Sequence, residues 1–324
     1  MPDDAPLTAL RSVPDGQPGN GVPASGRPTH GRPGTGPRDL RRGILAIVGA
    51  ALLFSISHAV IKVEGAIYPL FQIIFFRGVF AIIPLLPFFW REGAAVMKTQ
   101  HPWLQAIRSA AGIASMIAFF YALQFLPLAD ATAINFTMPL FVTALSVPIL
   151  RERVGWRRWA AVAVGFSGIL LMTRPGASLL DAAILIALAS AFGYAVAVLC
   201  MRKLGPTDRS ATTSFYFTIS SALIGAAALP FVWVQPTLTG WITLSLVGII
   251  SGTAQLLMTA GYRLAPAALA APFDYTSMIW AVLLGFLIWG DVPTAGVLAG
   301  AALVIGSGLF ILHRERVRHA PLPD

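Results

Sequence analysis

Three ionisable side chains, His58, Arg77 and Asp274, lie within long apolar stretches of this sequence. An ionisable group inside a bilayer span costs about 2.5–3.5 kcal/mol on insertion scales, so each of these groups needs a partner or a function. Arg77 is the deepest of them. It could bind an anionic group such as a carboxylate, or it could fix helix packing by bonding backbone carbonyls or a buried acid.

Asp274 and His58 are the candidates for proton coupling. A carboxylate at partial membrane depth can exchange a proton when burial and its neighbours tune it, and Pro272 opens the backbone ladder beside it. The alternative for Asp274 is a helix N-terminal residue that accepts backbone N–H bonds. Histidine titrates near neutral pH, although a lone membrane histidine can also be a hydrogen-bonded packing residue.

Neutral polar and aromatic side chains could line a pathway together with Arg77. We expect substrate contacts from Asn135, Tyr121, Tyr194, Gln255, Tyr275 and Trp280. The tyrosines could instead anchor the chain at a membrane interface, and Asn135 could cap a helix. Arg108 lies near the start of its apolar run, so we expect its side chain to extend to the membrane surface.

The sequence contains no motif that is typical of an enzyme. The single cysteine, Cys200, gives no disulfide framework, and no His, Asp or Glu cluster has metal-ligand spacing. No phosphate-binding loop is present. We therefore expect neither a catalytic residue, nor a metal, nor a cofactor.

The composition sets the broad class of the protein. Of 324 residues, 56% are hydrophobic and 11% are charged, against about 25% charged in a soluble domain. So few charges cannot supply the polar surface that a soluble protein of this size needs. This excludes an ordinary soluble enzyme and a nucleic-acid binder despite the net charge of +9, and it makes the lipid bilayer the main partner.

Apolar runs long enough to cross about 30 Å of hydrocarbon follow one another from Gly43 onward. They lie at 43–63, 69–89, 103–124, 132–150, 159–173, 180–200, 212–233, 241–260, 270–289 and 294–312. Barrel strands alternate in polarity and these runs do not, so they predict helices. The expected fold class is an all-α polytopic membrane protein with ten transmembrane helices.

The positive charges predict the orientation. With the N-terminus in the cytoplasm, nineteen of the 23 Lys and Arg residues fall on the inner side, whereas Lys62 and Arg174 fall outside. This bias predicts that both termini of the multi-pass chain are cytoplasmic, in the cell (inner) membrane. Residues 1–37 hold eight prolines and seven glycines and are expected to form a disordered cytoplasmic tail. Residues 313–324 are the expected C-terminal tail.

The chain also contains an internal duplication, of residues 38–175 and 176–312. Residues 121–152 align with 260–291 at an offset of 139, which places Asn135 on Asp274, and LPFFW at 86–90 matches LPFVW at 229–233. A repeat of five helices is odd in number, so the second copy must be inverted in the membrane. Inverted repeats are typical of secondary transporters.

With these segments the chain resembles the drug/metabolite transporter superfamily, in its ten-helix EamA-type branch. The resemblance is carried by FFRGVF (75–80), LPLADATAINFTMPLF (126–141) with RERV (151–154), and LAPAALAAPFDYTS (264–277) with WGDVP (289–293). It implies gradient-driven passage of a small polar organic metabolite by alternating access. Within the family, uptake of S-adenosylmethionine or riboflavin and export of amino acids or drugs all occur.

The alternatives from other classes are an intramembrane enzyme and a non-transporting membrane scaffold. An enzyme would need clustered acids or histidines, and a scaffold has no reason to keep polar side chains in several spans. The small-xxx-small pair Gly296 and Gly300 explains close helix packing and leaves a homodimer open.

Overall fold

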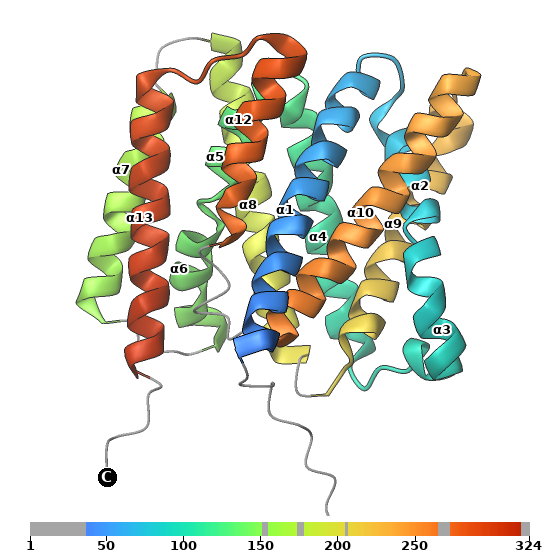
Figure 1. The fold of residues 1–324 in the computed structure, drawn as a ribbon, viewed down its shortest axis with the longest axis horizontal. Coiled ribbons are helices and arrows are strands. Elements are labelled where there is room, and N and C mark those ends of the chain that lie inside the picture. Colours follow the sequence, from blue (N-terminus) through green and yellow to red (C-terminus); the bar gives the residue numbers. More distant parts are fainter. Residues whose placement is uncertain (1–36, 151–154, 174–177, 205–206, 265–272, 319–324) are drawn as a thin grey trace, which may run out of the picture. The chain divides into compact units, whose positions relative to one another are not determined.

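The computed structural model describes residues 37–150, 155–173, 178–204, 207–264 and 273–318. Throughout these ranges the regular elements are helices, as Figure 1 shows. Residues 1–36 of the predicted tail, the RERV motif and Pro272 lie outside the described residues. The prediction of an all-helical fold is confirmed for the described part of the chain.

The elements of the first half are α1 (Pro37–Glu64), α2 (Leu70–Phe80), η1 (Ile83–Leu85), α3 (Leu86–Glu92), η2 (Gly93–Met97), α4 (Pro102–Leu123), α5 (Leu128–Asn135), α6 (Met138–Leu150) and α7 (Trp156–Thr173). Those of the second half are α8 (Ser178–Leu204), α9 (Ser210–Val232), α10 (Leu238–Leu264), α12 (Thr276–Trp289) and α13 (Ala295–Arg318).

Within the described ranges, seven helical stretches are long and apolar enough to cross a membrane. They are Asp39–Glu64, Leu70–Arg91, Pro102–Leu123, Leu128–Ile149, Ala182–Met201, Ala211–Val232 and Leu238–Gly261. Thr276–Trp289 and Ala295–Ile311 are shorter apolar helices. The chain is therefore built as a polytopic membrane protein.

Prolines divide two of the predicted runs. The run at 69–89 divides after Phe80, because Pro84 and Pro87 lack the N–H group that a continuous helix needs. The run predicted from residue 132 begins earlier, directly after Pro127, and divides between α5 and α6 at Phe136 and Thr137. α12 ends at Trp289 and is followed by Gly290, whose positive φ of 72° is the left-handed conformation that favours glycine.

Glycines allow the backbones of α2 and α9 to come into direct contact. A Cβ on Gly78 of α2 would lie 2.6 Å from the backbone nitrogen of Ala222, and one on Gly225 of α9 would lie 2.6 Å from that of Phe75. Small residues allow such close packing between membrane helices, where no hydrophobic driving force pulls the helices together.

The helix contacts link the two halves throughout. α1 packs against α10 and α12, and α8 packs against α4 and α6. α2 pairs with α9, α5 with α12, and α7 with α13. A Cβ on Gly168 of α7 would lie 2.8 Å from the carbonyl oxygen of Gly300, so this glycine of the GxxxG pair faces α7 of the same chain.

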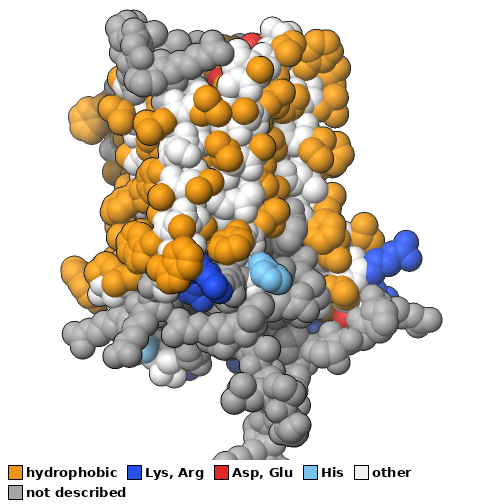
Figure 2. All heavy atoms as spheres, turned by 90° about the vertical axis from the view of Figure 1, so that its left-hand side faces the viewer, with side chains coloured by type: hydrophobic (Ala, Val, Ile, Leu, Met, Phe, Trp, Pro, Cys, Tyr) orange, Lys and Arg blue, Asp and Glu red, His pale blue; other side chains and the backbone are white. Residues whose placement is uncertain are grey.

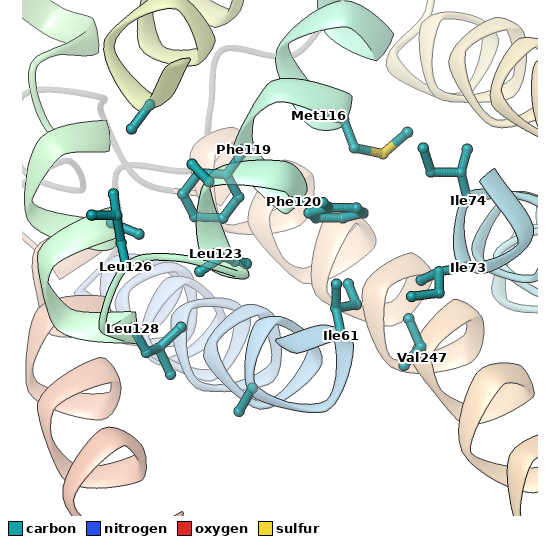
Figure 3. Close-up of a cluster of buried hydrophobic side chains, with 14 of the residues drawn as sticks. Ile61, Ile73, Ile74, Met116, Phe119, Phe120, Leu123, Leu126, Leu128 and Val247 are labelled. Atoms are coloured by element: carbon teal, nitrogen blue, oxygen red, sulfur yellow. The ribbon is translucent and has the colours of Figure 1, made fainter. Parts of the chain in front are cut away.

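The largest apolar core joins α1, α2, α4 and α10. Figure 3 shows Ile61 of α1, Ile73 of α2, Phe120 of α4 and Val247 of α10 around one interior. The other side of the fold, formed by α7 and α13, presents a broad apolar surface (Figure 2). On this surface the Lys, Arg and His side chains gather toward the lower end, as expected for a chain that is solvated by lipid over its middle.

Candidate functional site

His58 lies on α1 among aromatic rings of its own helix and of α4. Its ring centroid is 4.9 Å from that of Phe119, 6.1 Å from that of Phe120 and 6.2 Å from that of Phe54. The His58 side chain remains partly accessible. It thus faces the packed interior between α1 and α4.

Arg77 points from α2 toward α4 and α9. Its Nη1 donates to Sδ of Met116 at 3.0 Å, and its guanidinium carbon lies 5.8 Å from the ring centroid of Phe120 and 6.0 Å from that of Phe217. Arg77 forms no ion pair with any carboxylate that the structure describes. A thioether is a weak acceptor, so this charge is held mainly by aromatic faces.

Arg108 of α4 differs from its predicted position at the membrane surface. The residue is 5% exposed, its guanidinium carbon lies 4.6 Å from the ring centroid of Phe217, and its Nη2 is 3.6 Å from Sδ of Met201. Snorkelling is therefore wrong for this residue: α9 and α8 supply the ring and the thioether that cover it. In the described part of the chain Nε and Nη1 of Arg108 have no acceptor.

The residues around the two arginines follow one face of α4. Arg108, Gly112, Met116 and Phe120 are spaced four residues apart and therefore share that face. A Cβ on Gly112 would lie 3.1 Å from the Phe217 ring, so the missing side chain makes room for this ring between the two charges.

The residues predicted on the ninth run lie beside α5. The rings of Tyr275 and Phe136 are 4.8 Å apart, and Ser277 donates to the carbonyl oxygen of Asp274 at 2.7 Å. Tyr194 of α8 lies within electrostatic range of both Asp274 and Arg108. The structure thus links Tyr275, the sequence neighbour of Asp274, with Phe136 of the first half.

Buried polar atoms of this region that lack a partner among the described residues include Oδ1 of Asn135 on α5, Oγ1 of Thr137 after α5 and Nε1 of Trp280 on α12. Buried polar groups are normally hydrogen-bonded, so such atoms call for a ligand or water. The predicted helix-capping role of Asn135 is not seen among the described contacts of α5.

Tyr121 and Gln255 are the two remaining predicted site residues. Tyr121 is 47% exposed, and its ring packs on that of Phe125, 5.1 Å between centroids. Gln255 is a partly accessible residue of α10. No described contact joins either of them to the arginines or to Asp274.

A charged cluster that the sequence did not reveal forms where α1 ends, α5 begins and α12 ends. Nζ of Lys62 donates to the carbonyl oxygen of Leu126 at 2.6 Å and lies 4.9 Å from the Trp289 ring centroid. Asp130 and Asp291 are within electrostatic range of Lys62. These residues lie far apart in sequence, so only their general position at helix ends was available as a signal.

Gln72, which is fully buried on α2, joins the two halves in the same way as a backbone segment would. Its Nε2 donates to the carbonyl oxygen of Val234 at 2.8 Å, and its Oε1 accepts from the N–H of Val234 at 2.9 Å. The side-chain amide therefore satisfies both backbone groups of the residue that follows the end of α9 by two positions.

Asp208, between α8 and α9, holds the start of α4. Its carboxylate accepts hydrogen bonds from the hydroxyl of Thr99, the backbone N–H of Gln100 and Nε2 of Gln105. Partial burial alone would raise the pKa of Asp208, but these hydrogen bonds outweigh it and lower that pKa below the ordinary value of 3.8.

Metal chemistry has no site in the described ranges, where no three His, Cys, Asp or Glu residues group together closely enough to hold an ion. The polar groups described above converge instead from helices of both halves. Such groups inside the bundle of a polytopic membrane protein are typical of membrane transporters.

Comparison with known proteins identifies the family. Residues 41–174 and 181–313 each match the model of the EamA-like transporter family, and the chain belongs to this family, within the drug/metabolite transporter superfamily. Its functional class is therefore a transporter and not an enzyme. The two matched ranges correspond to the two halves of the internal duplication.

Several curated relatives span most of this chain. The S-adenosylmethionine uptake transporter of Rickettsia bellii is 28% identical over 76% of this chain and 84% of its own length. The riboflavin transporter of Rhizobium johnstonii is 30% identical over 85% and 92%, and the pseudopaline exporter CntI of Pseudomonas aeruginosa is 28% identical over 82% and 94%. A solved crystal structure of a protein covers 86% of this chain and 98% of its own at 19% identity, with a TM-score of 0.59, which shows the shared fold.

Proposed function

We propose that this protein is a secondary active transporter that moves a small polar organic metabolite across the cytoplasmic membrane by alternating access. The observation that carries the proposal is the set of incompletely partnered polar groups from both halves inside the bundle. Arg77 on α2, Asn135 on α5 and Trp280 on α12 supply these groups. A transported molecule would complete their hydrogen bonding while it is bound.

The helix pairing supports ten transmembrane helices arranged as two inverted five-helix repeats. Seven spans and two shorter apolar helices account for nine crossings, and α7, with Arg157 and Arg158 in its first turn, is the tenth. Exchanging the two repeats converts the α1–α10 contact into α8–α4 and the α1–α12 contact into α8–α6. The pairs α2–α9 and α7–α13 map onto themselves, as a two-fold axis requires.

The charge distribution supports cytoplasmic termini. In Figure 1 the beginning of α1 and the end of α13 lie at the same end of the drawing as α3, which carries Arg91. The Lys, Arg and His side chains in Figure 2 gather at that end as well. Positive charge on the inner side is the usual arrangement of such loops.

The relatives' names support a polar solute with a ring system or an amino-acid part. We propose uptake of an S-adenosylmethionine- or riboflavin-like solute, with Arg77, Asn135, Tyr194, Tyr275 and Trp280 as binding residues. Export is the second candidate, because one relative is named as an exporter of pseudopaline. Gln255 on α10 and the exposed Tyr121 on α4 are kept as further candidate contacts.

We assign proton coupling to Asp274 and His58. Asp274 lies next to Tyr275, which contacts Phe136 of the other repeat, so a change in its charge acts at a contact between the halves. His58 packs on Phe120, the ring that Arg77 also faces. Proton binding at these two residues would therefore influence both the repeat contact and the substrate-binding charge.

Counterflow in liposomes tests this function. Protein-containing vesicles preloaded with unlabelled solute should exchange radiolabelled S-adenosylmethionine or riboflavin faster than protein-free vesicles. Asp274→Asn should lose gradient-driven accumulation and retain exchange, whereas Asp39→Asn, at the start of α1, should behave as the wild type. Full concentrative uptake by Asp274→Asn would contradict the coupling role, and exchange of neither solute would contradict the proposed substrates.

A further inference from the structure

Arg108 carries a buried charge that the described protein does not neutralise. Only 5% of the residue's surface is exposed, and neither Nε nor Nη1 has an acceptor in the described part of the chain. Its described neighbours are a phenyl ring and a thioether, which contribute little against the cost of desolvating a guanidinium group. Helix packing alone would be better served by an apolar side chain of similar volume.

Arg77 provides a second guanidinium group on the same aromatic ring. Phe217 lies 4.6 Å from the guanidinium carbon of Arg108 and 6.0 Å from that of Arg77. Arg77 donates to Met116, which lies about two turns further along α4 than Arg108, so the two side chains approach Phe217 from different levels of this helix. The Phe217 ring lies between these levels, beside Gly112.

We propose that Arg77 and Arg108 are two successive binding positions for one anionic group, a carboxylate or a phosphate, of the transported molecule. Arg77 would receive this group from the outer side and Arg108 would hold it on the inner side, with the Phe217 ring as the barrier between them. This rests on the transport function and orientation proposed above.

The chemistry of the side chains fits this role. A guanidinium group presents a planar set of N–H donors that binds carboxylate or phosphate in bidentate fashion. Two guanidinium nitrogens of Arg108, Nε and Nη1, have no acceptor among the described residues, and the Tyr194 hydroxyl lies within electrostatic range of this guanidinium group. Two guanidinium groups at one ring would let the anion move from one positive charge to the next with only the Phe217 ring to pass, which limits the desolvation cost of the step.

Anion binding can be measured without knowing the transported molecule. The purified full chain in a neutral detergent, free of phospholipid, is titrated with sodium phosphate and separately with sodium acetate, at an ionic strength held constant with sodium chloride. The midpoint of thermal unfolding reports binding to the folded state. The two titrations distinguish a phosphate site from a carboxylate site.

Both anions, or one of them, should raise the midpoint of the wild type in a saturable way. Arg108→Gln and Arg77→Gln should each raise the half-saturating concentration by roughly tenfold or more, the effect of one charged hydrogen-bonding partner. The double variant should lose the response, and Arg91→Gln, at an exposed arginine of α3, should keep it. An unchanged response in Arg108→Gln would overturn the proposal, as would a wild type that responds to neither anion.

Loss of folding is separable from loss of binding. Because Arg108→Gln removes an unneutralised buried charge, its midpoint without anion should equal or exceed that of the wild type. A lower midpoint with an intact anion response would show a packing role and contradict the proposal. If the glutamine variant does not fold, Arg108→Lys keeps the charge and loses the planar donors, and an unweakened response from it would also overturn the proposal. Failure of solute exchange in liposomes, by contrast, bears on the transport function alone.

Discussion

Replacing Gln72 by leucine should remove the side-chain link between α2 and the segment after α9. Leucine fills a similar volume but leaves the N–H and the carbonyl oxygen of Val234 without their partner. Each unsatisfied backbone group costs about 1–3 kcal/mol when it is buried, which gives an upper range of about 2–6 kcal/mol. Val234 is 41% exposed, so water replaces part of the lost bonding. We therefore expect a loss of about 2 kcal/mol.

Thermal unfolding of the purified protein in detergent measures this loss. For a chain of this size, about 2 kcal/mol corresponds to a fall in the unfolding midpoint of roughly 3 °C. Gln100→Leu is the matched control, because this glutamine is exposed and contributes only its backbone N–H to a described hydrogen bond. An unfolding midpoint of Gln72→Leu within about one degree of the wild type would refute the idea that this amide joins the two halves.

Two further predictions concern packing and pH. Gly225→Ala should lower the unfolding midpoint by several degrees, because the added Cβ would lie 2.6 Å from a backbone nitrogen of α2 that cannot rotate away. Gly306→Ala is the control and should leave the midpoint unchanged, because nothing lies within 4 Å of its added carbon. Equal midpoints for the two variants would contradict the close α2–α9 contact. Asp208 has a pKa below its ordinary value of 3.8, so it contributes stability above that pH and loses it as the pH falls through the folded-state pKa. Asp208→Asn should therefore be less stable than the wild type at pH 7, and the difference in midpoint should shrink below about pH 4; a constant difference from pH 7 to pH 3 would count against the carboxylate's role.

The apolar runs and the duplication were accessible to sequence reasoning because each depends on local composition or on fixed spacing. The interruptions within these runs also carried a signal. Pro84 and Pro87 mark the end of α2, and Pro139, at the start of α6, marks the break at Phe136 and Thr137. The exact residue at which each helix stops was not accessible, because a proline excludes a continuous helix over several preceding positions.

The candidate site shows the same division. Their positions inside long apolar runs singled out His58, Arg77 and Asp274. The short distance of Arg108 from the start of its run, by contrast, led to the wrong prediction that its side chain reaches the membrane surface. What covers Arg108 is Phe217, more than a hundred residues away in the chain. The Lys62 cluster and the Gln72 link were missed for the same reason, because their partners come from other helices.

The glycine contact between α2 and α9 has a mechanical consequence. These are corresponding helices of the two repeats, and their backbones touch at Gly78 and Gly225 with no side chain between them. Two helices in such contact can tilt about the touching point far more easily than they can separate or slide. The helices would then rotate about this contact while the outer and inner ends of the bundle open in turn. Arg77 lies one residue from Gly78, and Phe217 lies two turns from Gly225 on α9, so both would move less than the ends of the helices.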